Sequence, residues 1–178
     1  MTATQPSPTD PRVSVAMITY NHEKFIAQAI ESVLMQQTDF LVELVIGEDC
    51  SSDGTRAIVH DYKKRYPDQI RLLLPKSNLG MIRNYVTTLD ACRGQYIALL
   101  EGDDYWTNPS KLQKQVDFLD SRPDCAICFH NGTVVQEDAS RPPRPFCPPD
   151  QKPISILEDL LRSCFLPTVS VMFRRGLF

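Results

Sequence analysis

The residues of this chain that could do chemistry are carboxylates crowded together directly after a short apolar run. Residues 96–100 have the apolar character of a buried strand, and Glu101, Asp103 and Asp104 follow at once. Like charges this close raise one another's pKa unless a cation lies among them. Carboxylate oxygens in a short cluster suit Mg²⁺ or Mn²⁺. The sequence therefore predicts a divalent-cation site and an enzyme that uses the cation, Mn²⁺ or Mg²⁺.

Two further polar loops also follow apolar runs. Residues 19–22 come after the predicted strand 13–18, and residues 48–55 come after the predicted strand 41–46. In open α/β sheets, ligands bind outside the carboxyl ends of the strands. We therefore expect all three polar loops to meet at one edge of a sheet.

The side chains in these loops suit a nucleotide diphosphate. Asp49 can accept a hydrogen bond from the imide N–H of a uracil-like base, and Tyr20 offers a ring against which a base can stack. A cation held by Asp103 and Asp104 would neutralise a diphosphate. The three loops together predict a nucleotide-diphosphate site that has no glycine-rich phosphate cradle.

The elements that must position these loops alternate between apolar runs and helix-period segments. This pattern favours an α/β fold, a three-layer sandwich around a mostly parallel central sheet. We expect a disordered tail over residues 1–11 and one domain over residues 12–178. The predicted strands cover 13–18, 41–46, 70–74, 96–100, 126–135 and 168–173, and the predicted helices cover 25–34, 58–66, 82–92, 109–119 and 154–164.

Three local patterns refine these elements. Asn108 and Pro109 are expected as the N-cap and first residue of a helix. Residues 142–153 contain six of the chain's 14 prolines, which predicts an extended surface loop. The helix after residues 78–80 has an apolar stripe that is expected to face the core: Ile82, Tyr85, Val86, Leu89 and Cys92.

Composition excludes several classes of protein. The formal net charge of −3 gives no field that would attract nucleic acid, so no nucleic-acid partner is expected. No apolar run reaches the length of a transmembrane segment and no signal peptide is visible, which predicts a cytoplasmic protein, either free or at the cytoplasmic face of the membrane. The six cysteines are scattered, so we expect reduced thiols, and Cys125 and Cys128 are interpreted as core residues rather than half of a zinc site.

Four motifs follow one another along the chain: residues 13–21, 48–55, 78–80 and 101–104. In this order and spacing they resemble the inverting glycosyltransferases of family 2, which have the nucleotide-diphospho-sugar transferase fold called GT-A. The resemblance is clear over residues 12–135 and looser beyond them. It implies transfer of a sugar, with inversion, from a nucleotide-diphospho-sugar to a hydroxyl of a glycan, a lipid-linked molecule or another acceptor. It also implies dependence on a divalent metal, favours UDP as the nucleotide and points to surface polysaccharide or glycan synthesis.

The resemblance also implies roles for single residues. Tyr20 would pack on the base, Asp49 would hydrogen-bond it, and Thr19 and Asp53 would support them. Asp103 would touch the ribose, and Asp104 would hold the metal.

Other positions are less defined by the resemblance. Arg83 is a candidate for a phosphate contact, although a surface arginine on a helix is the more common explanation. Glu48 and Glu101 stand where the family usually has aspartate, so their contacts are expected to differ.

The catalytic base is the part that the resemblance places outside this chain. In similar enzymes an Asp or Glu follows the strand expected here at 168–173, which puts the base beyond Phe178, and the chain is expected to be part of a longer protein. Inside the chain His130 is interpreted as a structural histidine. Four acids are interpreted as surface charges: Glu137, Asp138, Glu158 and Asp159. The alternative function is a truncated, non-catalytic fragment that binds nucleotide-sugar but lacks the base.

Two other enzyme classes fit less well. Sugar-phosphate nucleotidyltransferases carry a glycine-rich loop with arginine and lysine after the first strand, which residues 19–22 do not resemble. A metal phosphohydrolase needs a base or nucleophile beside its metal, and none is evident here.

Overall fold

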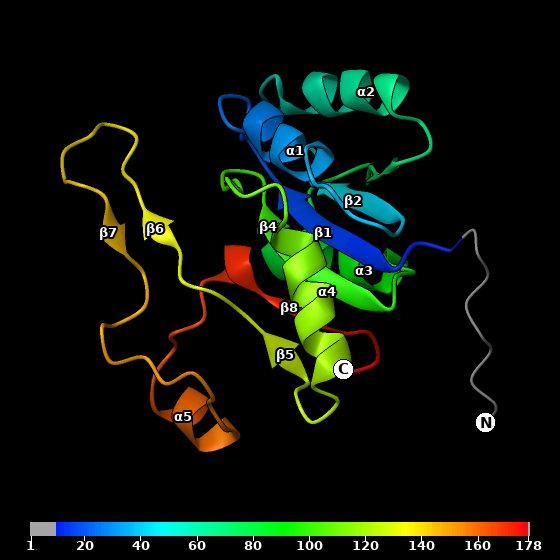
Figure 1. Ribbon diagram of the computed structural model, residues 1–178. Coiled ribbons are helices and arrows are strands. Elements are labelled where there is room, and N and C mark those ends of the chain that lie inside the picture. Colours follow the sequence, from blue (N-terminus) through cyan, green and yellow to red (C-terminus); the bar gives the residue numbers. More distant parts are fainter. Residues whose placement is uncertain (1–9, 178) are drawn as a thin grey trace.

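The computed structural model describes residues 10–177, and its helices and strands alternate through most of that range (Figure 1). The expected tail over residues 1–11 lies mostly outside the described residues. The main elements are β1 (Val13–Thr19), α1 (Ile26–Leu34), β2 (Val42–Glu48), α2 (Thr55–Arg65), β3 (Ile70–Leu73), α3 (Met81–Ala91), β4 (Tyr96–Glu101) and α4 (Lys111–Ser121). The rest are β5 (Ile127–Cys128), β6 (Thr133–Val134), β7 (Arg144–Pro145), α5 (Leu157–Arg162), the 3₁₀ helix η1 (Thr168–Ser170) and β8 (Met172–Arg174).

A six-stranded sheet in the order β3-β2-β1-β4-β8-β5 forms the centre of the fold. β1 pairs in parallel with β2 and with β4, and β2 pairs in parallel with β3. β8 is antiparallel to both β4 and β5. The prediction of an α/β fold with a mostly parallel central sheet is confirmed.

Helices cover both faces of this sheet, as parallel strands require. Val13, Val15 and Met17 of β1 belong to one core cluster, which also contains buried residues of α1, α2 and α4. Ala16 belongs to a second cluster on the opposite face, against which Leu89 of α3 packs. Successive side chains of a strand point to opposite faces, so β1 supplies both cores. The sheet is therefore the middle of three layers.

The buried face of α3 differs from the predicted one. Ile82 is 73% exposed and Val86 is also exposed, whereas Asn84 and Thr88 are buried. The reason lies in Gly47 of β2, because a Cβ there would come within 2.1 Å of Thr88 Oγ1. Asn84 Nδ2 donates to the Gly47 carbonyl at 2.8 Å, so α3 packs on the strand through polar side chains. Leu89 and Cys92 of the predicted stripe do face the second core.

The region after α4 also departs from the prediction. The single strand expected over 126–135 is wrong: β5 joins the central sheet, while β6 pairs with β7 in a separate two-stranded sheet. The last strand, expected over 168–173, is η1 followed by β8. Gly132 lies between β5 and β6, and glycine weakens a continuous strand.

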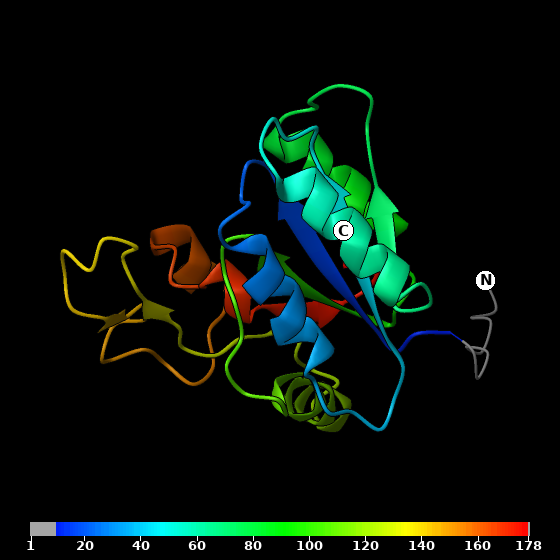
Figure 2. The same ribbon diagram turned by 90° about the horizontal axis from the view of Figure 1, so that it is seen from above.

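Residues 131–166 form a segment that stands off from the sheet in both Figure 1 and Figure 2. It contains β6, β7 and α5, and α5 has no buried residue. β7 lies inside the proline-rich loop, and α5 is shorter than the helix expected over 154–164. This projecting segment is the least packed part of the described chain.

Two smaller expectations have clear outcomes. α4 begins at Lys111 rather than Pro109, because the Asn108 side chain accepts a hydrogen bond from Ser110 N at 2.9 Å and forms a turn before the helix. All six cysteines are free thiols, with Cys128 buried in the core. Within residues 10–177, no helix combines the length and apolar character needed to cross a membrane.

Candidate functional site

The strand register brings the three polar loops to one edge of the sheet. Thr19, the last residue of β1, pairs with Glu48 of β2, and Ile18 pairs with Glu101 of β4. The backbone continues these pairings past the strand ends, where Asp49 N donates to Thr19 O at 3.0 Å and Gly102 N donates to Ile18 O at 2.9 Å. The loops that follow β1, β2 and β4 are thus adjacent, as the sequence predicts.

Hydrogen bonds fasten the β1 loop to the β2 loop. Asn21 N donates to Ser51 Oγ at 3.0 Å, and Asn21 Oδ1 accepts a bond from Ser52 N at 2.8 Å. His22 N donates to Thr55 Oγ1 at 2.8 Å. Asn21 has a φ of 55°, a conformation that asparagine tolerates better than most residues. The β1 loop therefore has a defined shape.

Asp53 adds a further link between these two loops. Its carboxylate accepts Thr55 N at 3.0 Å at the start of α2 and Glu23 N at 3.1 Å in the β1 loop. Burial alone would raise the pKa of Asp53, but the hydrogen bonds from Thr55 and Glu23 outweigh it and lower that pKa. Asp53 therefore connects the two loops through its ionised carboxylate.

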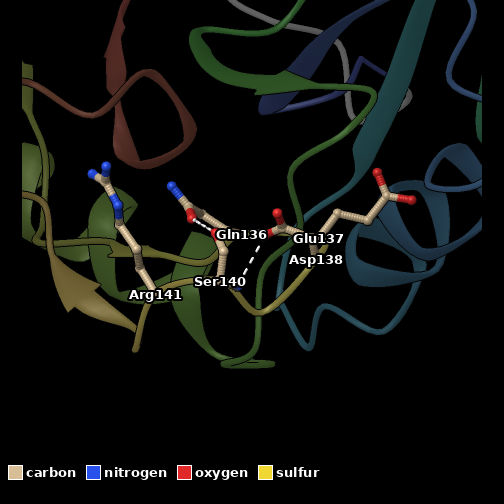
Figure 3. A pocket seen from close by; sticks show the side chains of 5 residues that line it. All are labelled: Gln136, Glu137, Asp138, Ser140 and Arg141. Atoms are coloured by element: carbon tan, nitrogen blue, oxygen red, sulfur yellow. Dashed lines mark hydrogen bonds between the residues drawn. The ribbon is translucent and has the colours of Figure 1, made fainter.

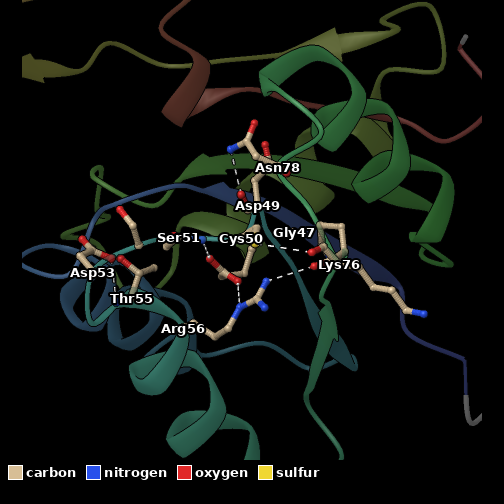
Figure 4. Close-up of polar contacts among 12 residues, drawn as sticks. Gly47, Asp49, Cys50, Ser51, Asp53, Thr55, Arg56, Lys76 and Asn78 are labelled. Atoms are coloured by element: carbon tan, nitrogen blue, oxygen red, sulfur yellow. Dashed lines mark hydrogen bonds and ion pairs between the residues drawn. The ribbon is translucent and has the colours of Figure 1, made fainter.

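Asp49 joins the β2 loop to the start of α3, as Figure 4 shows in part. Its two carboxylate oxygens accept Leu79 N at 2.7 Å and Gly80 N at 3.0 Å. Asn78 Nδ2 donates to the Asp49 carbonyl at 2.9 Å. Each carboxylate oxygen has a second lone pair, so this buried aspartate can still accept a hydrogen bond from a ligand.

Glu48 is fully buried, and its two side-chain partners, Ser51 and Arg56, are labelled in Figure 4. Its Oε1 accepts Ser51 N at 2.6 Å, and its Oε2 pairs with Arg56 Nε of α2. Arg56 also donates to the Pro75 carbonyl at 3.3 Å. The longer side chain that replaces the usual aspartate therefore reaches an arginine on the next helix and fixes the β2 loop.

The acidic turn, residues 101–104, is the most charged part of this edge. Burial raises the pKa of Glu101, and the charges of Asp104 and Asp103 raise it further. Burial also raises the pKa of Asp104, with a further rise from Asp103 and an opposing effect of His22. His22 Nε2 is 3.8 Å from Asp103 Oδ2. Among residues 10–177, this histidine is the one positively ionisable group within ion-pair distance of the three acids.

These acids fit a divalent cation. The described residues contain no preformed group of three metal-ligating side chains. That is consistent with Mg²⁺-type sites, in which one or two carboxylates hold the ion and water or substrate phosphates complete its shell. A cation among Glu101, Asp103 and Asp104 would relieve the repulsion that raises the pKa values of Glu101 and Asp104.

The other residues predicted for the site lie in different settings. Thr19 is buried, and its Oγ1 lies 3.3 Å from His22 Nδ1. Tyr20 is 46% exposed at the same edge, and its ring is available for stacking. Arg83 is exposed on the first turn of α3, and within residues 10–177 its guanidinium forms no hydrogen bond or ion pair.

The candidate bases inside the chain lie outside this edge or are bonded elsewhere. Glu137 Oε1 pairs with Lys24 Nζ at 2.8 Å, and Asp138 Oδ1 accepts Ser140 N at 3.0 Å. Burial lowers the pKa of His130, whose Nδ1 lies 2.7 Å from Asn131 O. In α5, Asp159 pairs with Lys152, and Glu158 is exposed.

A surface hollow forms part of the projecting segment rather than the edge with the three loops (Figure 3). All of its lining residues are exposed: Gln136, Glu137, Asp138, Ser140 and Arg141. None of the residues predicted for nucleotide or metal belongs to it.

Sequence reasoning missed two residues beside the acidic turn. His22 follows the Tyr20 loop and faces Asp103, and its position one turn before α1 gave no specific signal. Lys111 has no distinguishing signal in the sequence, yet its ammonium lies 3.8 Å from the centre of the Trp106 ring. Only the fold brings these pairs together.

Comparisons with known proteins agree with this arrangement. A family model described as glycosyl transferase family 2 matches residues 14–178. The glycosyltransferase TuaG of Bacillus subtilis, assigned to teichuronic acid biosynthesis, is 34% identical over 130 residues, covering 73% of this chain and 50% of TuaG.

Two solved structures have the same fold. The mannosyltransferase PcManGT from Pyrobaculum calidifontis, in complex with GDP-Man and Mn²⁺, gives a TM-score of 0.59 at 26% identity, covering 68% of this chain and 36% of PcManGT. S. aureus TarS 1–349 in complex with UDP gives a TM-score of 0.58 at 27% identity, covering 71% of this chain and 38% of that chain.

The chain spans about half the length of the curated relatives that it matches, for example 50% of TuaG. The family match nonetheless begins within β1 and extends to the end of the sequence. By this match, and by the mostly parallel sheet with three polar loops at its carboxyl edge, the chain belongs to glycosyl transferase family 2 and has its GT-A fold.

Proposed function

We propose that this chain binds a nucleotide-diphospho-sugar at the edge formed by the three loops, and that it is the donor-binding part of an inverting glycosyltransferase. The observation that carries the proposal is the acidic turn. Glu101 and Asp104 are half-buried carboxylates with raised pKa values, and they lie one strand away from the Tyr20 loop and two strands from Asp49. Acids in this setting favour a cation and the anionic ligand that comes with it.

The nucleoside would lie against the β1 and β2 loops. We assign the exposed Tyr20 ring to stacking on the base and Asp49 to its imide N–H, because the carboxylate is held rigid and retains free lone pairs. Thr19 and Asp53 would fix the two loops in this position. A guanine base also presents an imide N–H, so this contact alone favours UDP and GDP over other nucleotides.

The diphosphate would lie above the acidic turn. Asp103 would contact the ribose, Asp104 would hold Mn²⁺ or Mg²⁺, and the free guanidinium of Arg83 is a candidate for a phosphate oxygen. The cation, when bound, would stabilise the negative charge that develops on the departing diphosphate. The protein would orient the donor so that the far face of the sugar is open to the acceptor.

Inversion requires a base on that far face to take the proton of an acceptor hydroxyl. We propose that this base is a carboxylate beyond Phe178 in the full-length protein. The acceptor would be a hydroxyl of a glycan, a lipid-linked molecule or another compound, with the reaction serving polysaccharide synthesis. TuaG, by its assignment to teichuronic acid biosynthesis, supports the polysaccharide role. The nucleotides and Mn²⁺ in the TarS and PcManGT complexes support the donor class and the metal.

Calorimetry with this chain and with the full-length protein tests the proposal. UDP and GDP would each be titrated with Mn²⁺, with Mg²⁺ and with excess EDTA. We expect tighter UDP binding with either metal than with EDTA, and sugar transfer by the full-length protein with inverted configuration at the anomeric carbon. Absence of metal-dependent binding of both nucleotides would overturn the proposal. Binding by both proteins without transfer by either would favour a non-catalytic binding function.

A further inference from the structure

The first residue of α4, Lys111, has an unusual environment. It is only 5% exposed, and among residues 10–177 its Nζ has no hydrogen-bond partner. The ammonium instead lies 3.8 Å from the centre of the Trp106 ring. Lysines are rarely buried unless paired, so an ammonium that contacts only an aromatic face requires an explanation.

The ring that Lys111 contacts belongs to the segment that follows the acidic turn. Trp106 comes two residues after Asp104, and it is 4% exposed. Its Nε1 donates to the carbonyl of Val169 in η1 at 2.6 Å. Trp106 is therefore a direct link between the acidic turn and η1, the segment that leads into β8.

α4 itself contacts η1 one helical turn beyond Lys111. Gln115 Nε2 donates to Ser170 O at 2.8 Å. Lys111 and Gln115 are four residues apart and share one face of the helix. The Lys111 side chain thus lies behind the indole, on the side of α4, while the indole N–H reaches η1.

Stability does not account for a lysine at this position. A buried charge without a partner lowers the free energy of unfolding, and an apolar side chain of similar length would fill the same space without that cost. What an apolar side chain cannot supply is the electrostatic attraction between a cation and the face of an indole ring.

We propose that Lys111 is a positioning residue whose ammonium holds Trp106 in place between α4 and η1, and thereby keeps Asp103 and Asp104 placed for the metal and the diphosphate. This inference rests on the proposed function of the acidic turn. It assigns Lys111 no contact with donor or metal. Its effect is transmitted through Trp106 alone.

The charge of Lys111 gives this contact a spectroscopic signature. Burial lowers the pKa of Lys111 to about 7, and the Cys128 thiol on β5 opposes the shift. His130, just after β5, is the other titratable group that interacts with this charge. Trp106 is the only tryptophan of the chain, so its emission reports the ammonium directly.

The test combines four variants, three on α4 and His130→Gln, with three measurements. Lys111→Met removes the charge, Lys111→Arg keeps it at every pH, and Lys114→Met is the matched control, because Lys114 is exposed on the same helix. For each, we would measure urea unfolding, UDP affinity with Mn²⁺, and metal-free tryptophan emission between about pH 5.5 and 9.

We expect Lys111→Met to be at least as stable as the wild type but to bind UDP with Mn²⁺ about tenfold more weakly. Lys111→Arg should retain affinity within about threefold. The wild-type emission should change near neutral pH, both Lys111 variants should lack that change, and His130→Gln and Lys114→Met should keep it.

The inference is overturned if Lys111→Met binds UDP with Mn²⁺ as tightly as the wild type. It is also overturned if its loss of affinity comes with an equal loss of stability, or if no emission change disappears in the Lys111 variants. If the wild type itself binds no nucleotide, the proposed function fails, and the emission measurement then decides the Lys111–Trp106 contact separately.

Discussion

Acidic side chains lie at both ends of the central sheet, and the two ends differ in the partners that compensate the carboxylate charge. Glu43, near the start of β2, is buried and accepts hydrogen bonds from Ser14 Oγ at 2.5 Å and from the Arg93 guanidinium at 2.8 and 3.1 Å. Asp104, at the other end, has no arginine or lysine partner within the described residues. Within the described residues, the positively ionisable group at this turn is His22, whose Nε2 lies 3.8 Å from Asp103 Oδ2.

The pKa values reflect this difference. Burial acts to raise the pKa of Glu43, Glu101 and Asp104, but at Glu43 the hydrogen bonds from Ser14 and Arg93 outweigh it and bring the pKa below its ordinary value. At Glu101 and Asp104 nothing outweighs burial, and neighbouring acids add to the rise. The comparison shows that partners distinguish a structural carboxylate from one that is available to a ligand.

The largest effect, a loss of nucleotide affinity, should come from a substitution in the acidic turn, the uncompensated end of the sheet. Asp104→Asn keeps the shape of the side chain but removes a charge that we assign to the metal. We expect affinity for UDP with Mn²⁺ to fall at least about 100-fold in calorimetry, without loss of stability. Glu43→Gln, at the compensated end, should leave that affinity within about twofold. An Asp104→Asn variant that retains Mn²⁺-dependent affinity would refute the assigned role.

At the compensated end of the sheet, removal of Arg93, the partner of Glu43, should lower the stability of the fold. Arg93→Met leaves the buried Glu43 carboxylate with only Ser14 and a backbone N–H as donors. We expect the free energy of unfolding in urea to fall by about 2 kcal/mol, because a buried charge loses its counter-ion. Arg122→Met, at an exposed pair with Asp124, is the control and should not shift the unfolding midpoint measurably. Equal midpoints for Arg93→Met and the wild type would contradict the comparison.

The contribution of Glu43 to the free energy of unfolding should depend on pH. The pKa of Glu43 is lower in the folded protein than its ordinary value of 4.5. Its stabilising contribution is therefore complete above pH 4.5 and is lost as the pH falls through the folded-state pKa. The difference in unfolding free energy between wild type and Glu43→Gln, measured by urea titration at several pH values, should shrink as the medium is acidified. A difference independent of pH would show that Glu43 is not ionised in the folded state.

The smallest effect is expected at an exposed acid of the projecting segment. Glu137 pairs with Lys24 in an exposed setting. Because such pairs contribute little, Glu137→Gln should change neither the unfolding midpoint nor UDP affinity beyond experimental error. A substantial loss of affinity would extend the donor site to the projecting segment.

The sequence pattern predicts the central part of the fold well. Apolar runs mark β1, β2 and β4, and the polar residues after them mark the edge where Asp49 and Asp104 lie. These signals are local, because a strand and the loop that follows it are continuous in sequence.

What the pattern does not predict depends on contacts between distant segments. α3 packs on the sheet through polar side chains because Gly47 of β2 leaves room for them. The apolar spacing of Ile82 and Val86 therefore predicts the wrong buried face. The pairing of β6 with β7 depends on the proline-rich loop, and the burial of Lys111 depends on where Trp106 is held. Residue types and their order predicted that the acids and the tyrosine would lie at one edge of the sheet, but they gave no sign that this lysine is buried.

The position of β1 between β2 and β4 has a consequence for which donors can bind. Because parallel strands are held about 4.8 Å apart by their hydrogen bonds, the proposed base contact beyond β2 and the proposed metal ligand beyond β4 are separated by two fixed spacings. No side chain on the helices can alter this interval. In the proposed donor complex, the sheet would set the distance between the base and the metal, and discrimination between sugars would arise from other parts of the protein.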